Sequence, residues 1–439
     1  MSLVLWLTAS LAAAETPLSL DQTVAMALER NPNIRSAELT ETIARIARTR
    51  AELDRVTAQL AVSSGATAGV TKPWDAPAVT ATDATWEARA TAVAPLYTGG
   101  RIGATIDQAA IDADVAAIDT TLTRRDVVRA AYTAYWTLKG FELQIAAAEE
   151  GLAASQEALD IIRSKADSGL AAGIDVNRST VDLYSQQDSL INTRAAMDQA
   201  EQDLLRLLHL GDEDLVLTSD PPAQSADAIV VPELPSVARP ELARQRLTEA
   251  RAAADVRIAR SAALPTVSVT ATTGIGADAA GAGVDGIGTV AVEEGDIGDL
   301  GRPTLDAVIG IELAWNPFDL LRTHDAIRSA KLARDRTVAA DEAERDRLDA
   351  EIRSAAIRVA ALRERYPLMG QQRELARDNQ TIVQDLYAQG SATILDLFNA
   401  QSAFRAAAIQ EAGLAVDLAT AELDLAWLLG EDVTTGARQ

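Results

Sequence analysis

The strongest constraint on the fold is a stretch of sequence that occurs twice, once in each half of the chain. The first copy reads KADSGLAAGIDV and contains Gly169 and Asp175; the second reads LYAQGSATILDL and carries Gly390 and Asp396 at matching places. Long helical patterns precede and follow each copy, so each is predicted to be the turn of a helical hairpin. A repeat unit of half the chain indicates a duplication rather than an array of short repeats.

The duplication extends outward from the turns. Asn31-Pro32 in the first half corresponds to Arg239-Pro240 in the second. Each half is predicted to run helix, strand, strand, long helix, turn, long helix. A signal peptide is predicted at 1–14, an equatorial linker at 211–236 and a tail at 431–439. The first repeat is predicted at 15–210, with strands at about 58–71 and 85–97 and a helical hairpin at 99–208. The second repeat is predicted at 237–430, with strands at about 264–276 and 304–316 and a hairpin at 320–429.

The N-terminus resembles a secretory signal. Its first fourteen residues, MSLVLWLTASLAAA, are apolar and end in small side chains, which predicts cleavage after Ala14. The usual basic residues at the start are missing, as they would be from a truncated or misassigned start. We nevertheless expect export, and no later segment supplies the roughly 20 apolar residues of a membrane-spanning helix.

Composition narrows the function classes. The net charge of -24 disfavours nucleic acid and anionic lipid as partners. The chain has no cysteine and only two histidines, His209 and His324. No nucleophile–base arrangement, phosphate-binding loop or metal-ligand spacing is visible. The sequence therefore predicts neither catalysis nor a cofactor nor a metal site.

The predicted strands alternate apolar and polar side chains. In the last of them, Leu305, Ile309 and Ile311 share one face, and Asp306 and Glu312 share the other. Segments of about ten residues with this alternation are typical of transmembrane β-barrel strands. A half-buried sheet of a water-soluble protein is the alternative, but the sequence offers few elements that could cover the apolar faces.

The predicted long helices carry heptad patterns. Leu138, Ile145, Leu152 and Leu159 recur every seven residues. Such seams pack as coiled coils. A helix of about 65 residues would be roughly 100 Å long. Membrane barrels begin at about eight strands, so the four strands of one chain require several copies to close one. Three copies give twelve strands continuous with a tube of helices, and a hollow tube with a polar interior is a conduit.

The chain resembles the TolC family of outer-membrane efflux channels over nearly its whole length. The resemblance rests on both hairpin turns and on four further stretches: LSLDQTVAMAL from Leu18, Asn31-Pro32, PLYTGGR ending at Arg101, and AYTAYW ending at Trp136. It implies a mainly α fold with β, in which a homotrimer forms a 12-stranded β-barrel continuous with a long α-helical barrel. It also implies a place in the cell outer membrane and the periplasm, and docking to an inner-membrane pump of RND or ABC type through a periplasmic adaptor.

In that family the hairpin turns form the periplasmic entrance. The resemblance assigns Asp396, Asp175, Tyr387 and Asn399 to the entrance or gate. Asn399 departs from an acidic family position, and Ala392 stands where a latch arginine is expected. Capping of a helix start is an equal alternative for the two aspartates.

The turn residues Gly169, Leu170, Gly390 and Ser391 are assigned by the resemblance to adaptor contact. The function it implies is a passive exit duct of a tripartite efflux or type I secretion system. The alternative is a periplasmic coiled-coil adaptor or scaffold without a membrane barrel, which would not depend on detergent.

Overall fold

The computed structural model describes residues 16–55, 59–71, 81–211, 215–219, 239–280, 304–316 and 319–430. The expected signal peptide and the expected tail lie outside these residues, as does most of the expected linker. The described residues belong to two compact units, one with residues 1–39, 117–244 and 341–439 and the other with 40–116 and 245–340. The predicted fold class, mainly α with β, is confirmed.

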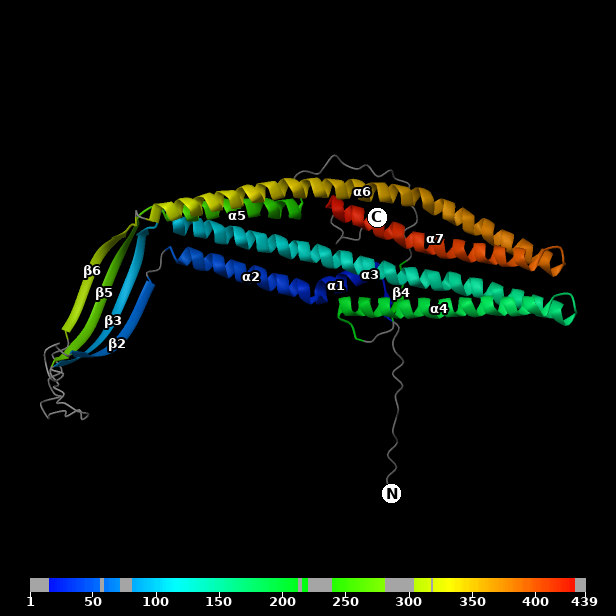
Figure 1. Cartoon of the computed structure of the whole chain (residues 1–439), viewed down its shortest axis with the longest axis horizontal. Coiled ribbons are helices and arrows are strands. Elements are labelled where there is room, and N and C mark those ends of the chain that lie inside the picture. Colours follow the sequence, from blue (N-terminus) through cyan, green and yellow to red (C-terminus); the bar gives the residue numbers. More distant parts are fainter. Residues whose placement is uncertain are drawn as a thin grey trace, which may run out of the picture. The chain divides into compact units, whose positions relative to one another are not determined.

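Seven helices and two short strands make up most of the described residues (Figure 1). The helices are α1 (Leu20–Arg30), α2 (Pro32–Leu53), α3 (Arg101–Asp167), α4 (Gly173–Leu208), α5 (Pro240–Ser261), α6 (Leu320–Ala388) and α7 (Ile394–Leu429), and two short strands, β1 (Thr16–Leu18) and β4 (Leu215–Leu217), pair in parallel. Among the described residues, no helix is both long and apolar enough to cross a membrane.

A four-stranded antiparallel sheet dominates the second unit. Its strands are β2 (Gln59–Thr71), β3 (Ala81–Tyr97), β5 (Thr266–Ala280) and β6 (Thr304–Ala314), in the order β2-β3-β5-β6 (Figure 1). The central pair joins the two halves of the sequence, with Ala92 opposite Ala271. The two outer strands, β2 and β6, each have one edge without a partner strand among the described residues.

The sheet exposes its apolar face in a single chain. Ile309 is 81% exposed, and Leu305 and Ile311 are exposed beside it. Glu312, on the opposite face of β6, is also exposed. Apolar patches of this kind mark surfaces that contact protein or lipid.

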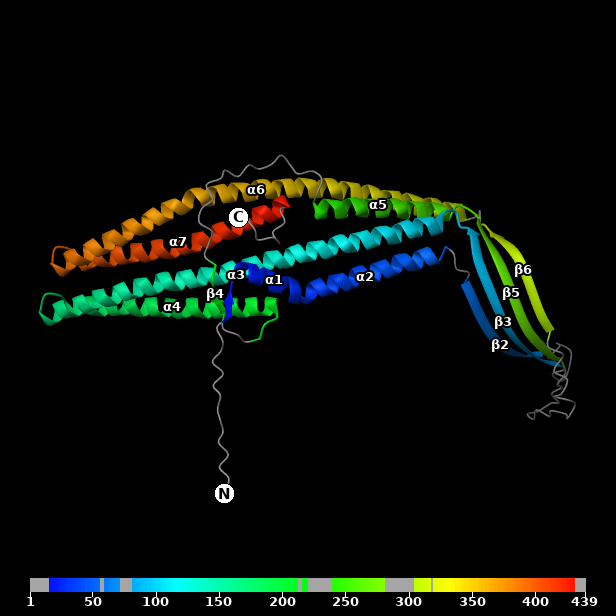
Figure 2. The same cartoon turned by 180° about the vertical axis from the view of Figure 1, so that it is seen from behind.

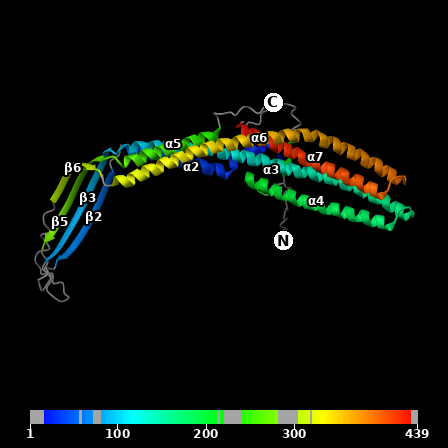
Figure 3. The same ribbon diagram turned by 45° about the horizontal axis from the view of Figure 1, so that its top comes forward.

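The first unit contains two helical hairpins, although α3 before residue 117 and α6 before residue 341 belong to the second unit. One consists of α3 and α4, and the other of α6 and α7; their turns adjoin at one end of the unit in all three views (Figures 1, 2 and 3). The helix starts have local causes. Ser19 and Gln22 form a capping box at α1, and Pro32 opens α2 after Asn31.

The main core of this unit surrounds Tyr135, in the AYTAYW motif. Its side chain is fully buried beside Leu138, Leu204 and other residues of α1, α3, α4, β1 and β4. Its hydroxyl donates to the Leu18 carbonyl at 3.3 Å and accepts from the Ser219 N–H at 2.8 Å. The motif therefore fixes the short β1–β4 pair against α3.

Candidate functional site

The two hairpin turns have the same backbone structure, as the duplication predicts. In the first, Gly169 has φ +75° and the Leu170 N–H donates to the Lys165 carbonyl at 2.8 Å. In the second, Gly390 has φ +80° and the Ser391 N–H donates to the Leu386 carbonyl at 2.8 Å. This is the Schellman ending of a helix, in which glycine takes the left-handed position without steric cost.

The tips of the turns are open to solvent. Leu170 is 78% exposed, and Gly169, Gly390 and Ser391 are exposed as well. A Cβ atom added at either glycine would meet nothing within 4 Å. A large, exposed apolar side chain on a turn of fixed backbone geometry suits contact with another protein.

Asp396 belongs to a capping box at the start of α7. Its carboxylate accepts from the Thr393 N–H at 2.9 Å and from the Thr393 hydroxyl at 2.6 Å, while its own N–H donates to that hydroxyl oxygen at 3.2 Å. These bonds to Thr393, first from the side chain and then from the backbone, lower the pKa of Asp396. The capping interpretation is correct for Asp396.

Asp175 occupies the same position of α4 but differs in its contacts. The cap residue there is Ala172, which has no side chain that could accept a hydrogen bond, and the helix start has no side-chain cap. The two turns thus share a backbone but not a capping box. Capping does not account for Asp175.

Tyr387 lies inside the first unit, where it joins the two hairpins. Its side chain is 6% exposed and packs with Ala158 and Ile162 of α3 and Leu397 of α7. Burial raises the pKa of the Tyr387 hydroxyl, and the charge of Asp175 raises it further.

Lys165 makes the polar contact to Tyr387. Its ammonium group donates to the Tyr387 carbonyl and lies 4.5 Å from the centroid of the Tyr387 ring. A cation over an aromatic face and at the C-terminal end of a helix is favourable on both counts. Lys165 was not among the residues predicted from the sequence, although it opens the repeated stretch and lies in the last turn of its helix.

The structure brings together only some of the predicted entrance residues. Asp396, Asn399 and Ser391 line a groove of about 480 Å³ with residues of α6. Asp175 and Tyr387 do not line this groove. Asn399 is exposed, and Ala392 lies partly buried near Tyr387.

Ion pairs between the two hairpins were not predicted from the sequence either. Glu150 of α3 contacts Arg377 and Arg373 of α6, and Arg405 of α7 lies 3.3 Å from Asp182 of α4. Most are partly exposed, so each contributes little to stability alone. Together they give the hairpins a fixed alignment, which heptad patterns do not specify.

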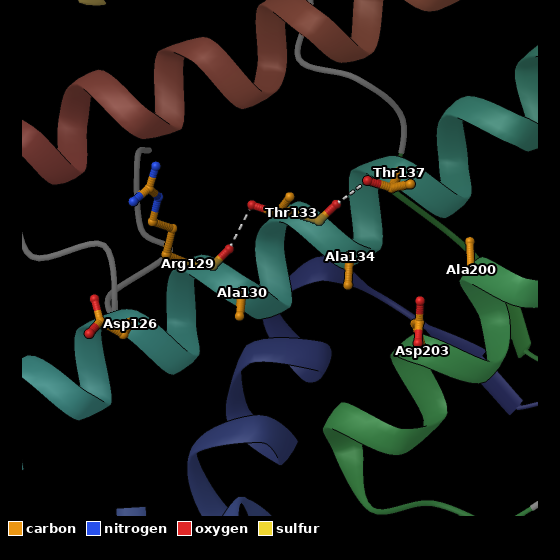
Figure 4. A pocket seen from close by; sticks show the side chains of 8 residues that line it. All are labelled: Asp126, Arg129, Ala130, Thr133, Ala134, Thr137, Ala200 and Asp203. Atoms are coloured by element: carbon orange, nitrogen blue, oxygen red, sulfur yellow. Dashed lines mark hydrogen bonds between the residues drawn. The ribbon is translucent and has the colours of Figure 1, made fainter. Parts of the chain in front are cut away.

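A second groove, of about 530 Å³, lies between α3 and α4 (Figure 4). Asp126 and Asp203 lie apart along it. Partial burial raises the pKa of Asp126, although the nearby charges of Arg129 and Arg125 lower it. Arg129 points away toward α7, where it lies 2.9 Å from Asp424. Within the described part of the chain, no group of three or more histidines or carboxylates could hold a metal ion.

Comparison with known proteins decides the family. The family described as outer membrane efflux protein matches residues 23–209 and 233–431, which is most of the chain. The chain belongs to this family. The predicted place in the outer membrane and the predicted resemblance to TolC-like channels are confirmed.

Individual relatives agree with the family. "Outer membrane efflux protein BepC" of Brucella suis biovar 1 is 33% identical over 112 residues, which cover 25% of this chain and 23% of that protein. The match thus spans less than a quarter of the relative's length.

Solved structures share the fold of this family member. The outer-membrane channel OprN has a TM-score of 0.77 at 21% identity, covering 94% of this chain and 90% of that one. The outer membrane protein VceC from Vibrio cholerae has a TM-score of 0.73 at 18% identity, covering 94% and 96%.

Proposed function

We propose that this efflux protein is the passive outer-membrane exit duct of a tripartite efflux or type I secretion system, working as a homotrimer. The observation that carries the proposal is the four-stranded sheet, in which β2 and β6 each have one edge that no other described strand pairs with. Open edges are not tolerated in lipid, because their N–H and C=O groups would lack partners. Three copies that join β6 of one to β2 of the next would give one closed sheet of twelve strands.

Exposed apolar seams on the helices support the same assembly. Leu368, Leu375 and Ile382 of α6 are exposed and spaced by seven, while Val181 and Ile191 are exposed on α4. Coiled-coil seams of this period bury against other helices. Neighbouring copies are the partners that a closed tube of helices supplies.

We place the periplasmic entrance of the duct at the hairpin turns. Three copies of Asp396 and Asp175 would gather negative charge there, with Asn399 and Tyr387 close by. The protruding turns, Gly169-Leu170 and Gly390-Ser391, would receive a periplasmic adaptor, which connects the duct to an inner-membrane pump of RND or ABC type. Substrate movement then needs no catalytic group in this chain.

The proposal is tested by mass and by conductance. Purified protein should have the mass of a trimer in detergent by light scattering, and it should form ion-conducting channels in planar bilayers. A stable monomer in water without detergent, and without channel activity, would favour the periplasmic adaptor instead and overturn the duct.

A further inference from the structure

Each of the four places where a helix meets the large sheet carries an exposed arginine (Figure 1). Arg55 follows the end of α2, Arg101 is the first residue of α3, Arg260 lies in the last turn of α5, and Arg322 lies in the first turn of α6. All four belong to the second unit. A cation in the first turn of a helix opposes the helix dipole, so helix stability does not explain Arg101 or Arg322.

Ion pairs of one kind connect α5 to α3 below the sheet, each joining an arginine of α5 to an aspartate of α3. Arg251 lies 2.5 Å from Asp112, and Arg257, nearer to the sheet, lies 2.7 Å from Asp107. At the end of this seam the pattern changes. There α5 again has an arginine, but α3 has a second arginine where an aspartate would complete the series.

Arg101 and Arg260 are the two cations at this end of the seam. Their helices approach closely, because a Cβ atom added to Gly99 would lie 2.8 Å from the Ser261 carbonyl oxygen. Neither guanidinium forms an ion pair with any residue that the structure describes. The whole chain carries a net charge of -24, yet the charge at this surface is positive, so an anion from outside the chain is attracted to it.

Aromatic side chains border the two arginines on the side of the sheet. Trp315, next to the end of β6, is 54% exposed, and its indole N–H donates to the Ala263 carbonyl at 3.3 Å, just beyond Arg260 in the chain. Tyr97, the last residue of β3, is 47% exposed. Exposed tryptophan and tyrosine are enriched at the level of the lipid headgroups, where an apolar protein surface meets water.

We propose that Arg101 and Arg260 bind the phosphate of an anionic phospholipid headgroup in the periplasmic leaflet of the outer membrane. A guanidinium group matches the oxygens of a phosphate with two parallel N–H donors. Trp315 and Tyr97 lie beside the acyl chains, a border that suits a lipid and that free phosphate would not need. The proposal rests on the proposed duct, in which the sheet lies in the membrane and the helices extend into the periplasm.

The test is a binding titration of the full-length protein in a neutral detergent. Phosphatidylglycerol, phosphatidylcholine or inorganic phosphate is added, and native mass spectrometry counts the molecules retained per chain. The wild type should bind phosphatidylglycerol most tightly. Arg101→Gln combined with Arg260→Gln should weaken this binding about thirtyfold, since each arginine near an anionic lipid surface contributes a factor of about five.

The matched control is Arg178→Gln combined with Arg365→Gln, which removes two exposed arginines of α4 and α6 in the first unit. It should bind phosphatidylglycerol as the wild type does. Equal affinity of the two double variants for this lipid would overturn the proposal. Tight binding of inorganic phosphate that disappears with Arg101 and Arg260 would also overturn it, because the site would then serve a free anion.

The mass of the assembly and its conductance are measured on the same samples. A conducting trimer whose lipid binding does not depend on Arg101 and Arg260 refutes this inference alone. A monomer without channel activity whose lipid binding does depend on them refutes the duct alone. The two proposals therefore fail in distinguishable ways.

Discussion

Asp396 can be tested as a cap and as an entrance charge with two neighbouring changes. Thr393→Ala removes the cap hydroxyl that bonds the Asp396 N–H but keeps the carboxylate. Loss of an N-cap threonine costs about 1 kcal/mol per helix, or about 3 kcal/mol over three copies. Asp396→Asn has the opposite design, since an amide oxygen can still accept from the Thr393 N–H while the charge is gone.

The two variants should separate in two assays. Thr393→Ala should lower the thermal midpoint in detergent and leave the cation selectivity of the channel in planar bilayers unchanged. Asp396→Asn should reduce selectivity with little change in midpoint, because a ring of like charges attracts cations. Wild-type selectivity in Asp396→Asn would refute the entrance role and leave Asp396 as a cap alone.

The pKa shift of Asp396 sets the pH window of the cap. A carboxyl whose pKa is lowered in the folded state stabilises it above the unfolded pKa of about 3.9. That contribution disappears only as the pH falls through the lowered folded value. A decrease in conductance between about pH 7 and pH 5 would therefore come from carboxylates crowded together in the proposed trimer, which would raise their pKa, and not from loss of this cap.

Three further changes test other parts of the structure. Ile309→Arg should impair recovery in outer-membrane fractions, at about 2–4 kcal/mol per copy for a cation facing lipid, whereas Glu312→Gln should assemble normally; equal recovery would show that the faces are wrongly assigned. Lys165→Met should raise the open probability in single-channel recordings, with Arg163→Gln, an exposed neighbour on α3, as the unchanged control. Tyr135→Phe should lower the thermal midpoint, by about 1–3 kcal/mol in unfolding free energy, since it leaves the Ser219 N–H without its acceptor; an unchanged midpoint would contradict that.

Local signals in the sequence were sufficient for the turns and for the strand faces. Glycine at the end of a helix is favoured because it adopts the left-handed backbone conformation at no steric cost. Both Gly169 and Gly390 have the positive φ that this predicts. The alternation in β6 likewise places Ile309 and Glu312 on opposite faces, because side chains alternate along every strand. The family resemblance then supplied the fold.

The sequence could not show how the two turns differ. Alignment makes Asp175 and Asp396 equivalent, and both do occupy the third position of their helices. Whether that position is capped depends on the residue three places earlier, which is Ala172 in one turn and Thr393 in the other. This difference between alanine and threonine can be read in the sequence, but the comparison of the two copies rested on the residues that they share.

Contacts between helices that are far apart in the chain could not be predicted from local sequence patterns. The family resemblance predicts an arginine where Ala392 stands. The alanine therefore suggested that no polar side-chain contact connects the two turns of this protein. The structure gives Tyr387 a cationic partner from α3 instead, since Lys165 both bonds the Tyr387 carbonyl and covers its ring. Because this contact joins α3 to α6 within one chain, it connects the two hairpins without any contribution from the other copies of the proposed trimer. Movement at the entrance would therefore have to break the Lys165 contact or carry both hairpins as one body.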